Sequence, residues 1–188
     1  LFIQLQELNA ALSVVTKAMS AKTPMPVLEG IHLEATREGL CLTCTDLALQ
    51  IETKIPAAVE REGSVVVPGR LFSDMMRRMP EESVLLSCES NTVNIACGKL
   101  KTTIQGIDAK EFPEMPQVKD GMAVELTQRS VRDIVRQTIF ATAQDETKPI
   151  LTGVLMEFEA EALIAVALDG YRLALRREPC NTAGENEP

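Results

Sequence analysis

The feature that most constrains the fold of this 188-residue chain is an internal repeat. Two segments, 26–46 and 149–169, align without a gap at a constant spacing of 123 positions and share seven identical residues out of 21. Ordinary composition would supply roughly one or two identities in such a run. A duplicated structural unit is therefore the first hypothesis. The identical pairs are Pro26 and Pro149, Leu28 and Leu151, Gly30 and Gly153, Glu34 and Glu157, Glu38 and Glu161, Leu40 and Leu163, and Asp46 and Asp169.

Each copy of the unit is expected to hold a first strand, one helix and three further strands. Apolar residues three or four positions apart predict the helix, and apolar–polar alternation predicts the strands. In the first copy the helix carries Leu5, Leu8, Leu12, Val15 and Met19, and the strands are 1–5, 31–35, 40–44 and 47–55. In the last copy the helix carries Val131, Ile134, Val135 and Ile139 on one face, and the strands are 122–126, 153–158, 163–168 and 172–176. A diverged middle copy has a helix opened by Pro68 with Leu71, Phe72, Met75 and Met79 inward, and strands 64–67, 84–88, 92–97 and 100–104.

Three such units predict an α+β fold in which two copies complete a domain. One helix on a small antiparallel sheet leaves an apolar helix flank and open sheet edges, which a second copy can cover. We expect copies one and two to form a domain at 1–117, the usual size for one hydrophobic core, followed by a connector within 109–121. Copy three, at 118–188, has no partner in this sequence. We therefore expect it to expose a sheet edge and a helix flank, and to fray or self-associate.

Composition favours a soluble, cytosolic protein without a metal or a cofactor. The longest apolar run, 162–168, is far shorter than the roughly 18 residues needed to span a membrane, and the first twenty residues lack the cationic start of a secretory signal. The five cysteines include one C-x-x-C, at Cys41 and Cys44. With a single histidine, His32, and no second cysteine pair, a tetrahedral zinc site cannot be assembled, so we expect reduced thiols.

The net charge of −8 argues at first sight against nucleic acid, but the distribution of charge argues differently. The second helix carries Arg70, Arg77 and Arg78 against Asp74, and the third carries Arg129, Arg132 and Arg136 against Asp133. In the third helix, spacings of three and four place the arginines on one stripe opposite the apolar stripe, with the acid elsewhere. Such a basic face suits a phosphate backbone bound without sequence preference, although arginines on the outer face of a helix are more often simply solvated.

Known catalytic motifs are missing from the sequence. It contains no G-x-S-x-G, H-E-x-x-H or G-x-G-x-x-G pattern, and Gly98-Lys99 lacks the earlier glycine of a phosphate loop because position 93 is valine. Asp46 and Asp169 remain as candidates for a small metal-dependent hydrolase. Both follow an expected strand at equivalent repeat positions, where aspartate most often forms a turn through its side chain. A structural role is therefore favoured over a catalytic one.

Six short segments carry a more specific signal. They are PVLEG at 26–30, LTCTDL at 42–47, VVPGRL at 66–71, FP at 112–113, PILTGV at 149–154 and DGYRLA at 169–174. In their order and spacing they resemble the bacterial DNA polymerase III beta subunit family, the replicative sliding clamps. The resemblance covers residues 1 to about 177, which correspond to the first half of that family's chain.

The resemblance implies a noncatalytic processivity factor. Family members have three domains of two repeats each, and two chains close head to tail into a homodimeric ring around double-stranded DNA, with the helices inside and the sheets outside. The implied partners are the alpha subunit of the replicative polymerase, the clamp loader, and other polymerases and repair proteins with clamp-binding peptides. The implied location is the cytoplasm, in association with the nucleoid.

Two sets of site residues follow from the resemblance. The residues that would approach the DNA backbone are Lys22, Arg70, Arg77, Arg129, Arg132, Arg136 and Lys148. The residues that match the middle domain's part of the groove for partner peptides are Leu151, Leu168, Gly170, Tyr171, Arg172 and Leu173. Leu168 replaces a threonine of many members and Tyr171 a histidine of some, which leaves the groove apolar but changes its detail.

A second hypothesis is a peptide-binding adaptor of the same fold that does not encircle DNA. Retention on circular but not on open-ended linear DNA would favour the clamp, whereas peptide binding without DNA retention would favour the adaptor. The hydrolase is the third hypothesis, and unchanged behaviour after replacement of both aspartates by asparagine would remove it.

Overall fold

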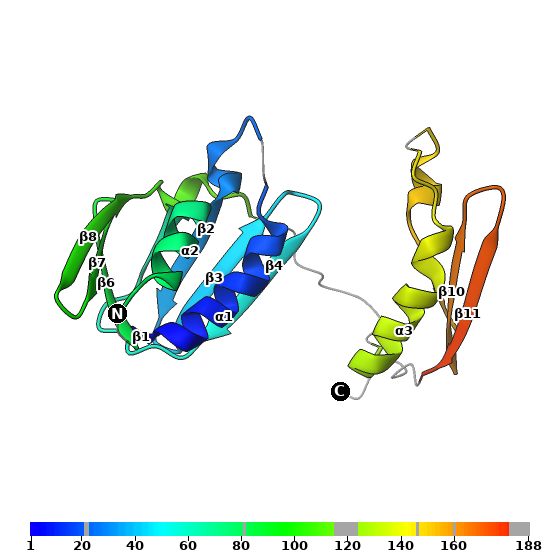
Figure 1. The fold of residues 1–188 in the computed structure, drawn as a ribbon, viewed down its shortest axis with the longest axis horizontal. Coiled ribbons are helices and arrows are strands. Elements are labelled where there is room, and N and C mark those ends of the chain that lie inside the picture. The colour runs from blue at the N-terminus through cyan, green and yellow to red at the C-terminus, as the bar shows by residue number, and fades with distance from the viewer. Residues whose placement is uncertain (21–22, 81, 115–123, 146, 160, 181–188) are drawn as a thin grey trace, which may run out of the picture. The chain divides into compact units, whose positions relative to one another are not determined.

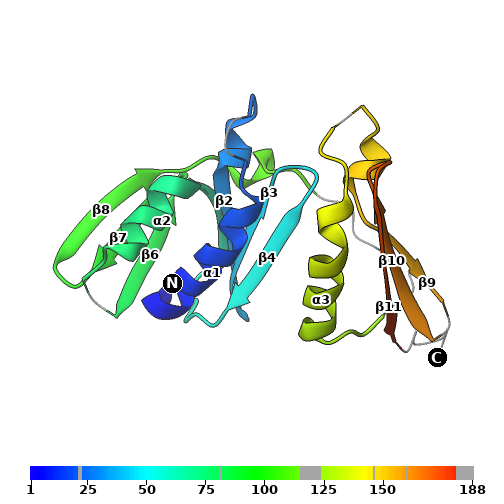
Figure 2. The ribbon, with the colours of Figure 1, turned by 45° about the vertical axis from the view of Figure 1, so that its right-hand side comes forward.

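The computed structural model describes residues 1–20, 23–80, 82–114, 124–145, 147–159 and 161–180. The chain divides into two compact units, unit 1 at Leu1–Pro116 and unit 2 at Gln117–Pro188. In each unit, helices pack against antiparallel strands (Figures 1 and 2). The predicted α+β fold is confirmed. None of the described helices has the length and apolar character that crossing a membrane requires.

Unit 1 contains two four-stranded antiparallel sheets, with the strand orders β4-β3-β2-β5 and β1-β6-β7-β8. The strands of the first sheet are β2 (Gly30–Thr36), β3 (Gly39–Thr45), β4 (Gln50–Ile55) and β5 (Gly63–Pro68). Those of the second are β1 (Phe2–Gln4), β6 (Ser83–Glu89), β7 (Thr92–Cys97) and β8 (Leu100–Gln105). The helices are α1 (Leu5–Val15) and α2 (Gly69–Arg77), and the short 3-10 helices are η1 (Thr16–Ala18), η2 (Pro26–Glu29) and η3 (Ala109–Glu111). Figure 1 shows α1 and α2 side by side in front of the sheets.

The two copies in unit 1 exchange their first strands. Strand β1, which begins copy one, pairs with β6 of copy two and places Ile3 opposite Val84. Strand β5, which begins copy two, pairs with β2 of copy one and places Ile31 opposite Val67. Each copy therefore supplies the fourth strand of the other copy's sheet, and two copies together complete a domain. Sequence periodicity alone does not reveal this exchange.

One continuous core lies between the helices and both sheets of unit 1. Leu8 and Leu12 of α1 and Phe72 and Met76 of α2 are buried in it, and full burial of such a side chain contributes about 1.5–3 kcal/mol. The prediction that Leu71 points inward is wrong, because its side chain is 51% exposed. It lies about 100° around the helix from Phe72, beyond the buried stripe.

Unit 2 reproduces the first copy at the spacing found in the sequence. Its elements are α3 (Gln128–Thr138), η4 (Ile139–Ala141), η5 (Pro149–Thr152), β9 (Leu155–Phe158), β10 (Ala162–Leu168) and β11 (Leu173–Pro179). Helix α3, η4, η5 and β10 begin and end 123 positions after α1, η1, η2 and β3. The sheet order β11-β10-β9 likewise matches β4-β3-β2. The repeat is therefore structural as well as sequential.

The described residues of unit 2 lack the contacts that the second copy provides in unit 1. Strand β2 pairs with both β3 and β5, whereas β9 pairs only with β10 among the described residues. Leu8 and Leu12 are buried, but the equivalent Val131 and Val135 are 43% and 39% exposed. Of the predicted apolar face of α3, only Ile134 is buried. The predicted exposure of a helix flank and a sheet edge is confirmed.

Several element boundaries differ from those predicted. The strand expected at 47–55 begins at Gln50, because Leu47 takes a positive φ of 77° in the preceding turn. The strands expected at 153–158 and 172–176 begin at Leu155 and Leu173. The predicted strand at 122–126 and the predicted connector at 109–121 lie partly outside the described residues.

Asp46 and Asp169 form matching turns after β3 and β10. Asp46 Oδ1 accepts hydrogen bonds from the backbone N–H groups of Ala48 at 2.9 Å and Leu49 at 2.7 Å. Asp169 Oδ1 accepts the equivalent bonds from Tyr171 at 2.9 Å and Arg172 at 3.0 Å. These backbone bonds lower the pKa of both carboxyls. The predicted structural role is confirmed.

Hydrogen exchange of the 188-residue chain should distinguish β9 from β2. We expect the amides of β9 to exchange at least about tenfold faster, because local opening there breaks hydrogen bonds on one side only. Mass spectrometry of peptides that cover each strand would measure this difference. Strand β4 is the control, since it is an edge strand in a complete domain. Equal protection of β9 and β2 in a monomeric sample would contradict the expectation.

The Asp46→Asn variant should lose stability in a pH-dependent way. Because the folded-state pKa of Asp46 is lowered, the charged carboxylate stabilises the fold above its ordinary pKa of about 4, and this contribution disappears as the pH falls through the lowered value. We expect the variant to be less stable than the wild type at neutral pH, with a difference that shrinks at about pH 3. Urea unfolding at both pH values measures it, with Asp74→Asn as the control. A difference that does not change with pH would refute this account.

Candidate DNA-binding helices and peptide groove

The basic face of α2 lies on the side of the helix that the core leaves free. Arg70 and Arg77 are seven residues apart, which places them on one stripe of the helix, and both are exposed. The buried stripe of the same helix contains Phe72 and Met76. Packing against the core therefore fixes the direction in which this stripe of arginines faces.

Helix α3 presents its arginines in the same way. Arg129, Arg132 and Arg136 are exposed, while Ile134 and Thr138 are the buried residues of this helix. The helix begins where the Thr127 hydroxyl accepts a hydrogen bond from the Ser130 backbone N–H at 3.1 Å, a standard N-cap. The three arginines consequently form one exposed stripe that spans two turns.

The prediction that the acid lies away from this stripe is wrong. Asp133 Oδ2 lies 3.9 Å from Arg129 Nε, and on α2 Asp74 Oδ1 lies 3.7 Å from Arg77 Nη1. Spacings of three and four along a helix bring such residues together. Exposed pairs of this kind contribute only about 0.2–1 kcal/mol, so a phosphate can displace the carboxylate. Within the described residues, Arg70, Arg132 and Arg136 form no ion pair.

Of the two predicted lysines, the structure describes one. Lys148 is exposed directly before η5, and its carbonyl accepts a hydrogen bond from the Leu151 N–H at 2.9 Å. Lys22 lies outside the described residues.

The predicted groove residues belong to η5, the end of β10, the β10–β11 turn and the start of β11. The β10–β11 turn and η5 lie at the same end of unit 2 (Figure 1). Leu168 ends β10, Gly170 occupies the turn with a φ of 92°, and Leu173 begins β11. Tyr171 is 99% exposed and Leu173 is 62% exposed. Leu151, in η5, is half-buried. Apolar side chains therefore reach solvent at this end of the unit.

A small buried cluster holds this end of unit 2 together. Ala141 of η4, Ala167 of β10 and Ala174 of β11 are buried against one another, with Val154 packed beside them. The Ala143 N–H, just after η4, also donates to the Leu151 carbonyl at 2.8 Å. The small alanine side chains allow these elements to approach closely. Two predicted groove residues, Leu168 and Leu173, adjoin Ala167 and Ala174 in the chain.

Arg172 is held by two neighbours. Its Nε lies 3.0 Å from Asp169 Oδ2, and its guanidinium carbon lies 5.9 Å from the centre of the Phe140 ring, within the range of a cation–π contact. Phe140 is a residue that the sequence analysis did not single out. Its unusual feature in the sequence is an aromatic side chain where the first copy has Lys17.

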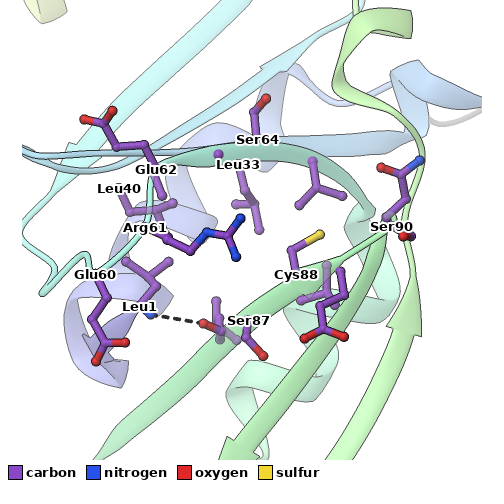
Figure 3. Close-up of a pocket in the computed structure, with 17 residues that line it drawn as sticks. Leu1, Leu33, Leu40, Glu60, Arg61, Glu62, Ser64, Ser87, Cys88 and Ser90 are labelled. Carbon is purple, nitrogen blue, oxygen red and sulfur yellow. Dashed lines mark hydrogen bonds between the residues drawn. The ribbon is translucent and has the colours of Figure 1, made fainter.

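A separate cavity of about 420 Å³ lies in unit 1 (Figure 3). Its walls include Leu33 of β2 and Leu86 of β6, and Figure 3 shows the side chains of Arg61 and Cys88 there. Desolvation raises the pKa of the Cys88 thiol, which disfavours the nucleophilic thiolate. None of the predicted site residues lines this cavity. No cluster of three or more potential metal ligands occurs among the described residues.

Comparison with known proteins identifies the family. The family described as "DNA polymerase III beta subunit, N-terminal domain" matches residues 1–116. The family described as the central domain of the same subunit matches residues 125–188. The beta sliding clamp of Synechococcus elongatus is 38% identical over 172 residues, which cover 90% of this chain and 46% of that protein. That of Bacillus subtilis is 34% identical over 184 residues, which cover 93% of this chain and 49% of that protein. The chain thus spans about half the length of these curated relatives.

Solved structures agree with the sequence relatives. The DNA polymerase sliding clamp from Bacillus subtilis matches 95% of this chain and 50% of its own with a TM-score of 0.91 and 33% identity. The Pseudomonas aeruginosa clamp bound to griselimycin matches 96% of this chain and 50% of its own with a TM-score of 0.88 and 26% identity. On these matches to two successive domains, the chain belongs to the bacterial DNA polymerase III beta subunit family, the sliding clamps.

Proposed function

We propose that this chain acts as part of a replicative sliding clamp, a noncatalytic ring that holds the polymerase on double-stranded DNA. The observation that carries the proposal is the stripe of exposed arginines on α3, the helix of a repeated unit whose other side packs on its sheet. Residues 1–117 would form the first clamp domain, and 118–188 the first half of the second. A fourth copy of the unit, in a full-length chain, would cover the exposed flank of α3 and the edge of β9 that has no strand partner among the described residues.

The proposed mechanism is topological. In the ring formed by two full-length chains, the helices face the central opening and their basic side chains approach the phosphates. The residues in these contacts would be Arg70, Arg77, Arg129, Arg132, Arg136, Lys22 and Lys148. Contacts to phosphate carry no sequence information and weaken with salt, so the ring can slide. Retention depends on closure, because a closed ring cannot leave a long duplex sideways. No covalent step is required.

The second part of the proposal is a docking site for partner peptides. The middle domain would supply one wall of an apolar groove. That wall would consist of the exposed Tyr171 and Leu173 together with Leu151, Leu168, Gly170 and Arg172. Its ligands would be peptides from the polymerase alpha subunit, the clamp loader, and other polymerases and repair proteins. The relative that binds griselimycin supports ligand binding by this family. The work would take place in the cytoplasm, on nucleoid DNA.

Reversal of charge on α3 should weaken DNA contact without opening the ring. In the full-length protein, we expect an Arg132→Glu, Arg136→Glu double variant to reduce the dependence of DNA affinity on salt by about 0.9 in log–log slope per lost phosphate contact. Fluorescence anisotropy with a short duplex at several salt concentrations measures the slope. Arg37→Glu, in the turn between β2 and β3, is the control and should leave the slope unchanged.

Retention on circular DNA is the direct test of a ring. Once loaded by the clamp loader, the wild-type protein should stay on a closed circle and be lost when a single cut makes the DNA linear. Equal retention on circular and cut DNA, or none on either with intact peptide binding, would favour the adaptor of the same fold.

The groove predicts a difference between two equally exposed leucines of β11. Leu173 and Leu175 are both 62% exposed, but only Leu173 adjoins the β10–β11 turn. We expect Leu173→Ala to weaken binding of a labelled polymerase alpha-subunit peptide by about tenfold, as truncation of an anchoring contact does. Leu175→Ala should change affinity less than about twofold. Similar losses for both variants would argue against a groove at this position.

A further inference from the structure

The two aspartate turns provide an internal comparison between copy one and copy three. The turn at Asp46 and the turn at Asp169 have the same two hydrogen bonds from backbone N–H groups to Oδ1. Leu47 and Gly170, at equivalent positions, both take a positive φ, of 77° and 92°. The aspartate and these backbone bonds are therefore common to both turns. In copy one, the Thr45 hydroxyl also accepts a hydrogen bond from the Leu47 N–H and donates one to the Leu49 carbonyl, both at 3.0 Å.

Copy three has other interactions at this turn, which copy one does not have. Position 172 is arginine, whereas the equivalent position in copy one is Leu49. Asp169 uses Oδ1 for the turn and Oδ2 for Arg172 Nε, at 3.0 Å. The ring of Phe140, which stands where copy one has Lys17, lies 5.9 Å from the same guanidinium. Both contacts thus converge on one side chain that has no counterpart in copy one.

The surroundings of Arg172 suit a bound peptide better than a purely structural ion pair. The Asp169 side chain is 17% exposed, whereas that of Arg172 is 58% exposed. The carboxylate that holds Arg172 is therefore shielded from solvent, while the guanidinium reaches it. Only Nε faces Asp169, and the two Nη groups remain without a hydrogen-bond partner among the described residues. The residues before and after Arg172 in the sequence, Tyr171 and Leu173, are both exposed.

Building on the proposed peptide groove, we propose that Asp169 and Phe140 are positioning residues for Arg172. Asp169 fixes one edge of the guanidinium and Phe140 supports its face, so that the free Nη groups point toward the peptide. A charge-assisted donor held in advance loses less conformational entropy on binding than a free arginine. Neither positioning residue needs to touch the peptide.

Peptide affinity in a double-mutant cycle tests this proposal. Asp169→Asn keeps the turn acceptor and removes the acceptor for Nε, Phe140→Leu keeps apolar bulk and removes the ring, and Arg172→Leu installs the residue of copy one. In the full-length protein, anisotropy with a fluorescein-labelled alpha-subunit peptide should show a loss of about three- to tenfold for each of the first two variants. In the Arg172→Leu background neither variant should cause a further loss, because both act through that side chain.

Two controls separate positioning from folding. Phe140→Tyr, which keeps the aromatic face, should restore affinity to within about twofold of the wild type. Asp46→Asn changes the matching turn of copy one and should leave peptide affinity unchanged. Unaltered affinity in Asp169→Asn, or equal losses with and without Arg172, would overturn the positioning role. If the wild-type protein does not bind the peptide at all, the proposed groove fails, and this inference with it.

Discussion

The pairing of β2 with β5 and of β1 with β6 is the interaction on which the rest of the structure depends. A unit of one helix and three strands leaves one sheet edge without hydrogen bonds and one helix flank without apolar contacts. Exchange of the first strands pairs the open sheet edge of each copy. It also brings α1 against α2, which gives each helix flank its apolar contacts. The described part of unit 2 has the equivalent helix and three strands without that exchange, and there the equivalent apolar residues Val131 and Val135 reach solvent.

This packing also explains how an acidic protein can present basic surfaces. The buried stripe of each helix is fixed by the sheet, so the opposite stripe is free to vary without cost to the core. In α2 and α3 it carries arginines, with Asp74 and Asp133 placed near enough to neutralise some of the charge. Exposed pairs of this strength are readily broken, which suits the proposed contact with DNA that does not hold the duplex in one place.

The order of elements could be predicted from the sequence because the repeat spacing of 123 aligns them. Side-chain directions were harder to predict. Leu71 looked like a core residue because it is apolar and adjacent to Phe72, yet one residue of helical rotation exposes it. Leu47 looked like the start of a strand, but its N–H donates to Thr45 Oγ1 and the next N–H, of Ala48, donates to Asp46 Oδ1, and these bonds hold it in a turn.

In the candidate site, too, contacts between side chains could not be predicted from the sequence. Its residues could be placed through their motifs, and their predicted roles in binding stay predictions. The contact of Phe140 with Arg172 joins residues 32 positions apart, and no pattern of spacing or composition reveals such a pair. Strand exchange escaped prediction for a similar reason, since partners such as Ile3 and Val84 are distant in the sequence.

Strand exchange has a consequence for how the chain folds. The Leu1 carbonyl accepts from the Leu86 N–H at 2.9 Å, across a separation of 85 residues. Contacts between such distant residues close large loops before they contribute stability, and they slow folding. During synthesis, β1 therefore remains unpaired until β6 has left the ribosome. In such a nascent chain, α1 and the first sheet remain an incomplete intermediate with exposed apolar surface, the kind of species that chaperones recognise.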